Sequence, residues 1–331
     1  MQVAVTGATG HVGANLVRAL LERGDTVRVV VYEESPALEG LHVERFTGDV
    51  LDRPSLEAAF TGAETVYHLA SMITLGRDRS GLVRRINVEG AANVADACLA
   101  AGVRRLVHFS SVHALTAYPA GRMVTEERPL ALEPRAPVYD RTKAAGEAVV
   151  LEAVQRGLDA VVVNPTGIIG PYDYQPSRMG QVIRDLAAGH MRILVDGGFN
   201  WADVRDVCAG AMAAASRGKT GERYLLPGHW RSMRQVSHAV SGITGVRAPK
   251  LVVPMWAARL AVPAAGLAAR FTGREPRFTR ASLHALRHHQ QVNGAKAATD
   301  LGYAPRPFQE TLADTLAWFR DAGGVLDQKR P

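Results

Sequence analysis

Three side chains have the types and spacing of a proton-transfer site: Ser111, Tyr139 and Lys143. Tyr139 and Lys143 are four positions apart in a helical pattern, which places both on one helix face. A phenol has an unperturbed pKa near 10. A lysine cation beside it favours the phenolate, so we expect Lys143 to lower the pKa of Tyr139 by roughly 1–3 pH units. Because Ser111 ends a predicted strand and can hold a substrate oxygen, the three residues predict acid–base chemistry at an alcohol or carbonyl.

A glycine-rich turn near the N-terminus predicts where a dinucleotide binds. An apolar run over residues 3–5 leads into this turn, and a helical pattern follows it. This context is typical of a dinucleotide fingerprint, because glycines let the pyrophosphate approach and the helix N-terminus attracts it. The spacing is Gly-x-x-Gly-x-x-Gly, and the candidate contacts are Gly7, Thr9, Gly10, His11, Val12 and Gly13.

Strand and helix patterns alternate over the first 170 residues. They predict an α/β fold with a Rossmann-type, doubly wound parallel sheet, whose ligands lie at the carboxyl ends of the strands. A single long helix is expected over residues 81–101. Further candidate cofactor contacts at the strand ends are Tyr32, Glu33, Asp49, Val50, Leu69, Ala70 and Ser71. Glu33 and Glu34 would repel a 2′-phosphate, which favours NAD, with NADP left open.

The pattern loosens beyond residue 170 into helices and short strands. We therefore expect a dinucleotide-binding core over residues 1–170 and a smaller, mainly helical substrate lobe over residues 171–331. Residues of about 198–225 are expected to return to the core. His113, Tyr172 and Arg205 are candidate substrate contacts, together with Ser111. Packing or solvent exposure explains His113 equally well, and loop packing does so for Tyr172, whereas a surface ion pair with Asp203 or Asp206 is the favoured interpretation for Arg205.

The charge distribution leaves two interpretations of one segment open. The net charge is +7, and residues 246–290 carry eight arginines and lysines against Glu275 alone. This basic segment is either a solvated face or a surface for an anionic substrate or a membrane headgroup, which leaves peripheral membrane contact open. We expect no integral membrane segment and no nucleic-acid partner.

The cysteines and histidines bear on the compartment and on metals. The chain has two cysteines, Cys98 and Cys208, which is too few for a disulfide framework. A strand is predicted to begin near Gln2, which leaves no room for a signal peptide, so we expect a cytoplasmic protein. His284 and His288 have an i, i+4 spacing that metal sites use. No cysteine or carboxylate nearby completes such a site, so no metal is expected.

These motifs together resemble the extended branch of the short-chain dehydrogenase/reductase superfamily, the NAD-dependent epimerase/dehydratase group. Within it they are most similar to the dihydroflavonol 4-reductase and 3β-hydroxysteroid dehydrogenase branch. The resemblance covers nearly the whole chain. It rests on the glycine turn and on Gly48-Asp49-Val50, Asn87-Val88-Glu89-Gly90, Phe109-Ser110-Ser111, Tyr139-Asp140-Arg141-Thr142-Lys143 and Asn164-Pro165-Thr166-Gly167-Ile168-Ile169-Gly170-Pro171.

The resemblance implies a role for each matching residue. Ser111 would orient the substrate oxygen, Tyr139 would be the acid/base, and Lys143 would hold the nicotinamide ribose and tune Tyr139. Asn87 would lie on the active-site side, and Pro165 and Ile168 would bring main-chain atoms to the carboxamide. The family also implies a homodimer through the helices that begin near residues 81 and 138, with candidate contacts Val94, Cys98, Ala145, Val149 and Glu152.

Three functions remain open at this point. The first is an NAD(P)-dependent oxidoreductase that interconverts a secondary alcohol and a ketone in a small, fairly apolar molecule. The second is a nucleotide-sugar epimerase that retains NAD, and the third is a cofactor-sensing regulator without chemistry. Sugar-nucleotide dehydratases usually carry Thr-Asp-Glu where this chain has Ser111-Val112-His113, so the acid that eliminates water is missing.

Overall fold

The computed structural model describes residues 1–76, 78–272 and 279–322. Its centre is a seven-stranded sheet in the order β10-β6-β5-β4-β1-β2-β3, and every neighbouring pair in it is parallel. The strands are β1 (Gln2–Thr6), β2 (Thr26–Val31), β3 (Glu44–Thr47), β4 (Thr65–His68), β5 (Arg105–Phe109), β6 (Ala160–Pro165) and β10 (Arg223–Leu226). The predicted Rossmann-type sheet is confirmed.

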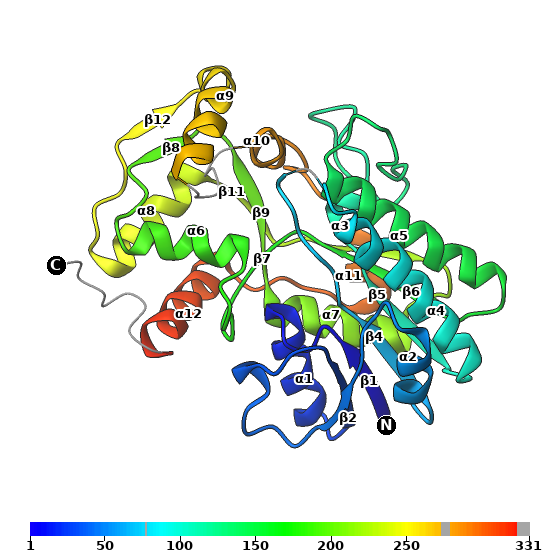
Figure 1. The fold of residues 1–331 in the computed structure, drawn as a ribbon. Helices are drawn as coiled ribbons and strands as arrows, with labels where there is room; N and C mark the ends of the chain where they lie inside the picture. The colour runs from blue at the N-terminus through cyan, green and yellow to red at the C-terminus, as the bar shows by residue number, and fades with distance from the viewer. Residues whose placement is uncertain (77, 273–278, 323–331) are drawn as a thin grey trace.

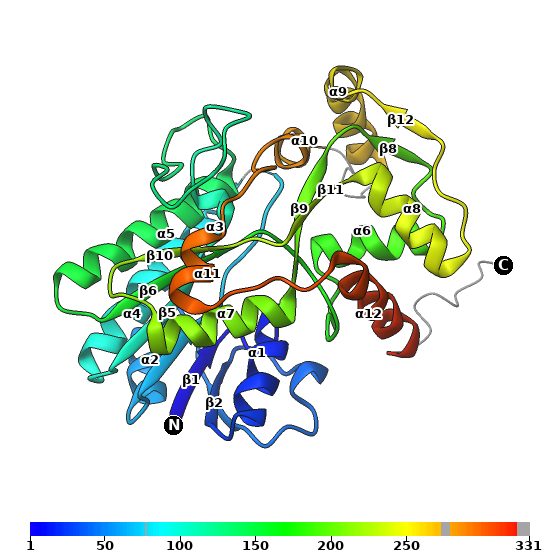
Figure 2. The same ribbon diagram turned by 180° about the vertical axis from the view of Figure 1, so that it is seen from behind.

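Helices cover both faces of this sheet (Figures 1 and 2). One face packs against α1 (His11–Glu22), α7 (Val204–Arg217) and α11 (Ala295–Leu301). The other packs against α2 (Arg53–Phe60), α4 (Gly90–Ala100) and α5 (Val138–Gln155). The strands are rich in β-branched residues, and all of them except the exposed edge strand β3 are mostly buried, as in other parallel sheets covered by helices. This double cover fixes the strand ends where the predicted site lies.

A second group of elements forms a lobe over the carboxyl edge of the sheet (Figure 1). It contains a three-stranded sheet of β7 (Gly167–Ile169), β9 (Gly198–Asp203) and β11 (His229–Ser232), and the pair β8 (Ile193–Val195) and β12 (Leu251–Val253). Its helices are α6 (Arg178–Ala187), α8 (Met233–Thr244), α9 (Met255–Thr272), α10 (Arg280–Arg287) and α12 (Phe308–Asp321). The lobe has its own apolar core, which includes Trp201, Ile183 and Leu312.

The helix expected over residues 81–101 is interrupted. It consists of α3 (Leu82–Arg84), a π-helical turn η2 (Arg85–Glu89) and α4. The turn η2 carries Asn87 and lies against α5 at Gly146, where an added Cβ would come within 2.2 Å of the Asn87 carbonyl oxygen. Two short 3₁₀ turns, η1 (Pro36–Leu38) and η3 (Val112–Ala114), follow β2 and β5. This close packing, which the local sequence pattern does not reveal, fixes Asn87 beside the start of α5.

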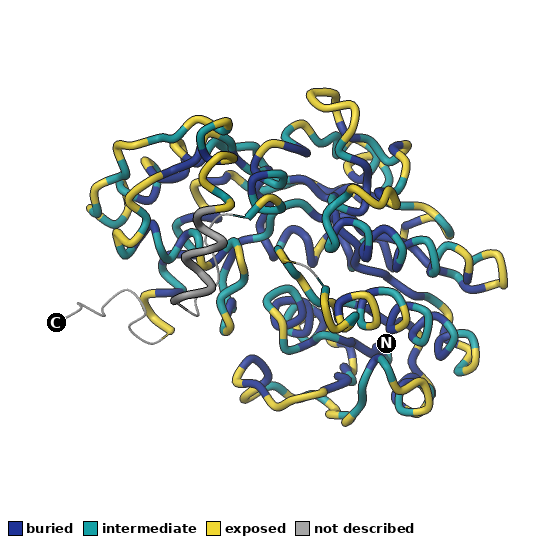
Figure 3. The backbone as a smooth tube through the Cα atoms, turned by 45° about the horizontal axis from the view of Figure 1, so that its top comes forward, coloured by how far each residue is buried: buried dark blue, intermediate teal, exposed yellow. Residues whose placement is uncertain are grey.

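Burial divides the molecule into covered strands and exposed helix faces (Figure 3).

Within the described ranges, no helix is long and apolar enough to cross a membrane. The first turns of α9 expose Trp256 and Leu260. Part of the basic segment, including Arg274, Glu275 and Arg277, lies outside the described residues.

Candidate active site

The glycine turn between β1 and α1 forms a cradle that side chains would fill. Gly7 has a left-handed φ of 72°, and an added Cβ would lie 2.5 Å from the Ala70 nitrogen. A Cβ on Gly13 would lie 2.1 Å from the Gly7 oxygen. Helix α1 starts after Gly10 with no side-chain cap, so its first N–H groups are left for another acceptor. An uncapped helix N-terminus behind small residues fits a pyrophosphate.

His11, within the same turn, ties α1 to the lobe. Its Nε2 lies 3.1 Å from the Pro171 carbonyl oxygen, and Asn15 Nδ2 donates to the same oxygen at 2.9 Å. Because that acceptor is a carbonyl, His11 Nε2 carries the proton. Burial lowers the pKa of His11, which favours the neutral ring. His11 therefore fixes the turn through a neutral hydrogen bond and adds no charge to the cradle.

The structure brings Ser111, Tyr139 and Lys143 together at the carboxyl ends of β5 and β6. Ser111 caps η3 by accepting from the His113 N–H at 3.2 Å and also shares a hydrogen bond with Tyr139. Lys143 Nζ donates to the Phe109 carbonyl oxygen at 2.6 Å. All three line one cavity of about 1140 Å³, together with the glycine turn.

The expected lowering of the Tyr139 pKa is wrong for this structure. Burial raises the pKa of Tyr139 to about 12, against the opposing hydrogen bond from Ser111, and the neighbouring Asp140 charge raises it further. Burial also lowers the pKa of Lys143 to about 8, partly offset by Glu147. The Lys143 ammonium is bound to the Phe109 carbonyl. Tyr139 is therefore held as a protonated phenol at neutral pH, which is the proton-donating form.

A buried ion network supports Lys143 and Ser111 from behind. Glu147 is fully buried one helical turn beyond Lys143. Its carboxylate lies 2.9 Å from Arg223 Nε and accepts from Asn164 Nδ2 at 2.8 Å. Asn164 also donates to the Ser111 carbonyl oxygen at 3.1 Å. The network thus fixes the Ser111 backbone and supplies the negative charge that Lys143 faces.

Asn87 acts on the loop after β4. Its Oδ1 accepts from the Met72 N–H at 2.7 Å, while its Nδ2 donates to the Met72 carbonyl oxygen and to Thr142 Oγ1, each at 3.0 Å. Both amide hydrogens are used in these contacts. Asn87 is therefore a positioning residue that ties the 71–73 loop to α5.

The predicted cofactor residues fall into two groups along the sheet edge. One group lines the cavity: Gly7, Gly10, His11, Val12, Gly13, Leu69, Ser71, Tyr139, Lys143, Pro165 and Ile168. Ala70 and Thr9 are adjacent to it. Tyr32, Glu33, Asp49 and Val50 lie further along the same edge, beyond the ends of β2 and β3. Asp49 Oδ1 accepts from the Leu51 N–H at 2.9 Å, and Glu34 pairs with Arg45 at 2.7 Å.

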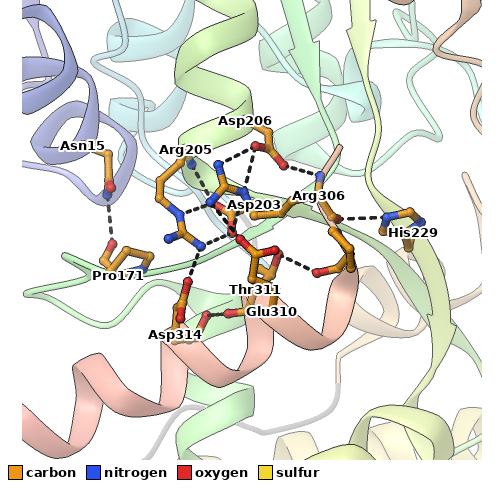
Figure 4. A network of polar contacts seen from close by, with 12 residues as sticks. Asn15, Pro171, Asp203, Arg205, Asp206, His229, Arg306, Glu310, Thr311 and Asp314 are labelled. Atoms are coloured by element: carbon orange, nitrogen blue, oxygen red, sulfur yellow. Dashed lines mark hydrogen bonds and ion pairs between the residues drawn. The ribbon is translucent and has the colours of Figure 1, made fainter. Parts of the chain in front are cut away.

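Two predicted substrate contacts lie in other environments. Tyr172 packs against Trp318, with ring centroids 4.8 Å apart, and against the Arg18 guanidinium. Arg205 belongs to an ion network beneath the lobe, with Nη2 2.8 Å from Asp203 and 2.7 Å from Asp314 (Figure 4). These contacts fix the lobe on the core, so the placement favours the packing and ion-pair interpretations over substrate binding.

The third substrate candidate, His113, does line the cavity, and other histidines join it. His284, His288 and His289 line the same end, together with Asp140. The ring of His113 lies 6.0 Å from that of Tyr139 and 5.0 Å from that of His289. Among the described residues, no group of three histidine, cysteine or acidic side chains is arranged to hold a metal ion. The sequence pattern does not connect these histidines with Tyr139. The one local signal is Asp140, which follows Tyr139 in the sequence and is a natural partner for a histidine.

The cavity walls beyond Ser111, Tyr139 and Lys143 are mostly apolar. They include Met72, Ile73, Met179, Val182, Met191, Ile193, Val195, Phe199, Met233 and Leu286, contributed mainly by the lobe. Arg178 and Arg192 lie among them. The arrangement is an apolar chamber with a serine, a phenol and an ammonium group at one end, which suits hydride chemistry on an apolar alcohol or ketone.

Comparison with known proteins agrees with this geometry. Residues 3–226 match the NAD dependent epimerase/dehydratase family. The chain is 40% identical to "Sterol demethylase protein B" of Methylococcus capsulatus, over 98% of this chain and 100% of that one. It is 29% identical to a 3-beta-hydroxysteroid dehydrogenase of Mycolicibacterium neoaurum, over 97% and 92%. The crystal structure of gox2253 superimposes with a TM-score of 0.86 at 34% identity, over 97% of this chain and 98% of that one.

The chain therefore belongs to the NAD dependent epimerase/dehydratase family. It is an enzyme of the oxidoreductase type in the extended short-chain dehydrogenase/reductase superfamily. The predicted family and the NAD-type cofactor are confirmed at this level, and the interpretation as a regulator without chemistry is set aside.

Proposed function

We propose that this enzyme interconverts a secondary alcohol and a ketone on an apolar, steroid-like substrate, with NAD as the hydride carrier. The observation that carries this proposal is the position of Ser111, Tyr139 and Lys143 at one end of a chamber with apolar walls. The names of two relatives, which refer to sterol and steroid chemistry, point to the same class of substrate.

The residues divide the chemistry as follows. Bound NAD supplies or accepts the hydride. Ser111 donates a hydrogen bond to the substrate oxygen, and Tyr139 gives its phenolic proton to that oxygen as a ketone is reduced. In the oxidising direction Tyr139 first gives up its proton to solvent, and the phenolate then takes the proton of the alcohol as the hydride leaves the substrate carbon. Lys143 provides the positive charge beside them, and the apolar walls exclude water from the reacting carbon.

The proposal is tested by incubating the purified protein with NAD and a 3β-hydroxysteroid. We expect formation of the 3-ketone with stoichiometric reduced cofactor. UDP-glucose is tested in parallel, because a nucleotide-sugar epimerase is the competing function. Epimerisation of the sugar without net cofactor reduction, combined with no turnover of the steroid, would replace the proposal by that alternative.

We also propose a cytoplasmic homodimer that pairs through α4 and α5. Support comes from the outer face of α5, where Ala145 and Val149 are half-buried and Glu152 is exposed. Val94 and Cys98 are excluded as contacts, because both are completely buried in the core of the single chain. The cytoplasmic location rests on two cysteines that are buried and unpaired.

A further inference from the structure

The lobe presents large apolar side chains to solvent on the adjoining elements β8, β12 and α9 (Figures 1 and 2). Trp256 and Leu260 are four positions apart on the first turns of α9, which places both on one helix face, and their exposed fractions are 67% and 74%. Leu251 of β12 is paired with Ile193 of β8, and these side chains are 56% and 44% exposed. Only Pro254 separates β12 from α9. We call the four exposed residues the apolar patch, and a group of this kind indicates an interaction surface.

Cations accompany the apolar patch along the chain. An exposed basic residue directly precedes three of its four members: Arg192, Lys250 and Arg259. Residues 246–263 contain no acidic residue, and Asp196 is the one carboxylate next to either strand. Apolar side chains flanked by cations are typical of segments that lie in a membrane interface, where tryptophan and leucine enter the acyl boundary and cations meet anionic headgroups.

The apolar patch also adjoins the cavity that holds the candidate active site. Arg192 and Ile193 are exposed and line that cavity as well. Arg259 lies close enough to His284 and His288, which belong to the cavity wall, for its charge to act on both. Burial and then neighbouring positive charges, including Arg259, lower the pKa of these two histidines. The patch therefore lies at the rim of the cavity, on the side formed by the lobe.

We propose that the apolar patch and its three cations dock the enzyme on an anionic lipid bilayer, with the cavity rim turned toward the lipid. Charge selects this occupant, because anionic headgroups complement Arg192, Lys250 and Arg259. A second copy of the chain would bring the same cations against one another, and like charges repel. The inference goes beyond the proposed function, and its binding test needs neither substrate nor cofactor.

The size of the apolar patch sets the expected strength of docking. Full burial of one large apolar side chain corresponds to roughly tenfold or more in affinity. One cation near an anionic surface corresponds to roughly fivefold. Docking through a few such side chains is reversible, and added salt weakens it by screening the cations.

The test is sedimentation of the full chain with two kinds of vesicle at low salt. One kind is phosphatidylcholine mixed with phosphatidylglycerol, and the other is phosphatidylcholine alone. We expect wild type to bind the mixed vesicles and to bind the neutral ones much more weakly. The double variant Trp256→Ser/Leu260→Ser should lose about tenfold or more in affinity. Ile243→Ser, at an exposed position near the end of α8, should bind like wild type.

A second pair of variants tests the charges. Arg259→Gln should bind the mixed vesicles roughly fivefold more weakly than wild type. Arg234→Gln is the matched control, because Arg234 is an exposed residue of α8 outside the patch, and it should bind like wild type.

Fluorescence shows whether the patch enters the lipid. The other three tryptophans of the chain are buried or half-buried, so quenching by bromine-labelled acyl chains should come chiefly from Trp256. Trp256→Phe keeps an apolar ring, so it should still sediment with the mixed vesicles while most of the quenching disappears.

The outcomes decide the proposal without reference to turnover. Absence of binding to the mixed vesicles overturns it, and so does binding that the double variant retains in full. Equal binding of wild type to both kinds of vesicle overturns it too, because the proposal requires anionic lipid. Self-association that the double variant abolishes, without vesicle binding, would assign the apolar patch to a second copy of the chain. None of these results changes whether the enzyme oxidises a 3β-hydroxysteroid in solution, which is measured separately.

Discussion

The substitution Gly13→Ala tests the geometry of the cofactor cradle. An added Cβ would meet the Gly7 oxygen at 2.1 Å and the Ala8 Cα at 2.7 Å, both backbone atoms that have no rotamer to change. Relief requires a shift of α1, whose residues Leu16 and Leu20 are completely buried. Overpacking of this kind costs about 1–3 kcal/mol, and a clash with backbone is at the upper end.

The matched control is Gly10→Ala. Its added Cβ would meet the Gly7 oxygen at 3.5 Å, an ordinary contact, and its φ of −78° suits alanine. Thermal unfolding should show Gly13→Ala melting several degrees below wild type, at roughly 2–4 °C per kcal/mol in domains of 150–250 residues. Gly10→Ala should unfold like wild type but bind NAD more weakly, because its methyl group projects at the N-terminus of α1. Equal melting temperatures for Gly13→Ala and wild type would refute the assigned close approach.

Three further predictions follow from the site. Calorimetric titration should show tighter binding of NAD than of NADP, because Glu33, beside Tyr32 at the end of β2, would repel the 2′-phosphate of NADP. Tyr32→Arg should narrow the difference in affinity between the two cofactors. Tighter binding of NADP to wild type would contradict this prediction. Glu147→Gln should shift the alkaline limb of the pH–kcat profile to lower pH. The Lys143 pKa is about 8 and Glu147 raises it, so removing that carboxylate makes Lys143 lose its charge at a lower pH; an unshifted limb would show that the Lys143 charge is not required. Sedimentation should give a dimer for wild type and a monomer for Val149→Asp, and a wild-type monomer at micromolar concentration would count against pairing through α5.

The fold and the convergence of Ser111, Tyr139 and Lys143 on one cavity could be predicted because their signals are local. The glycine turn is contiguous, and Tyr139 and Lys143 are joined by one helical turn. Ser111 ends a neighbouring strand, and parallel strands bring their carboxyl ends to one edge of a sheet. These short-range rules were sufficient to assemble the centre of the site.

The remainder depends on packing between distant segments. His284 reaches Asp140 because α10 folds back over the core, and the spacing of the histidines alone indicated at most a metal pattern. The sign of the Tyr139 pKa shift depends on burial, which outweighs the hydrogen bond with Ser111, and Lys143 is not among the groups that shift it. Arg205 is held by Asp314 of α12, a partner that local sequence does not identify.

The most direct test of the central claim is the turnover of Tyr139→Phe. This change removes the phenolic proton and keeps the ring that lines the cavity. General acid–base groups contribute about 10²–10⁴-fold to rate. With a 3β-hydroxysteroid the account predicts a fall in kcat of that order and an NAD affinity close to that of wild type, whereas wild-type turnover in Tyr139→Phe would contradict it.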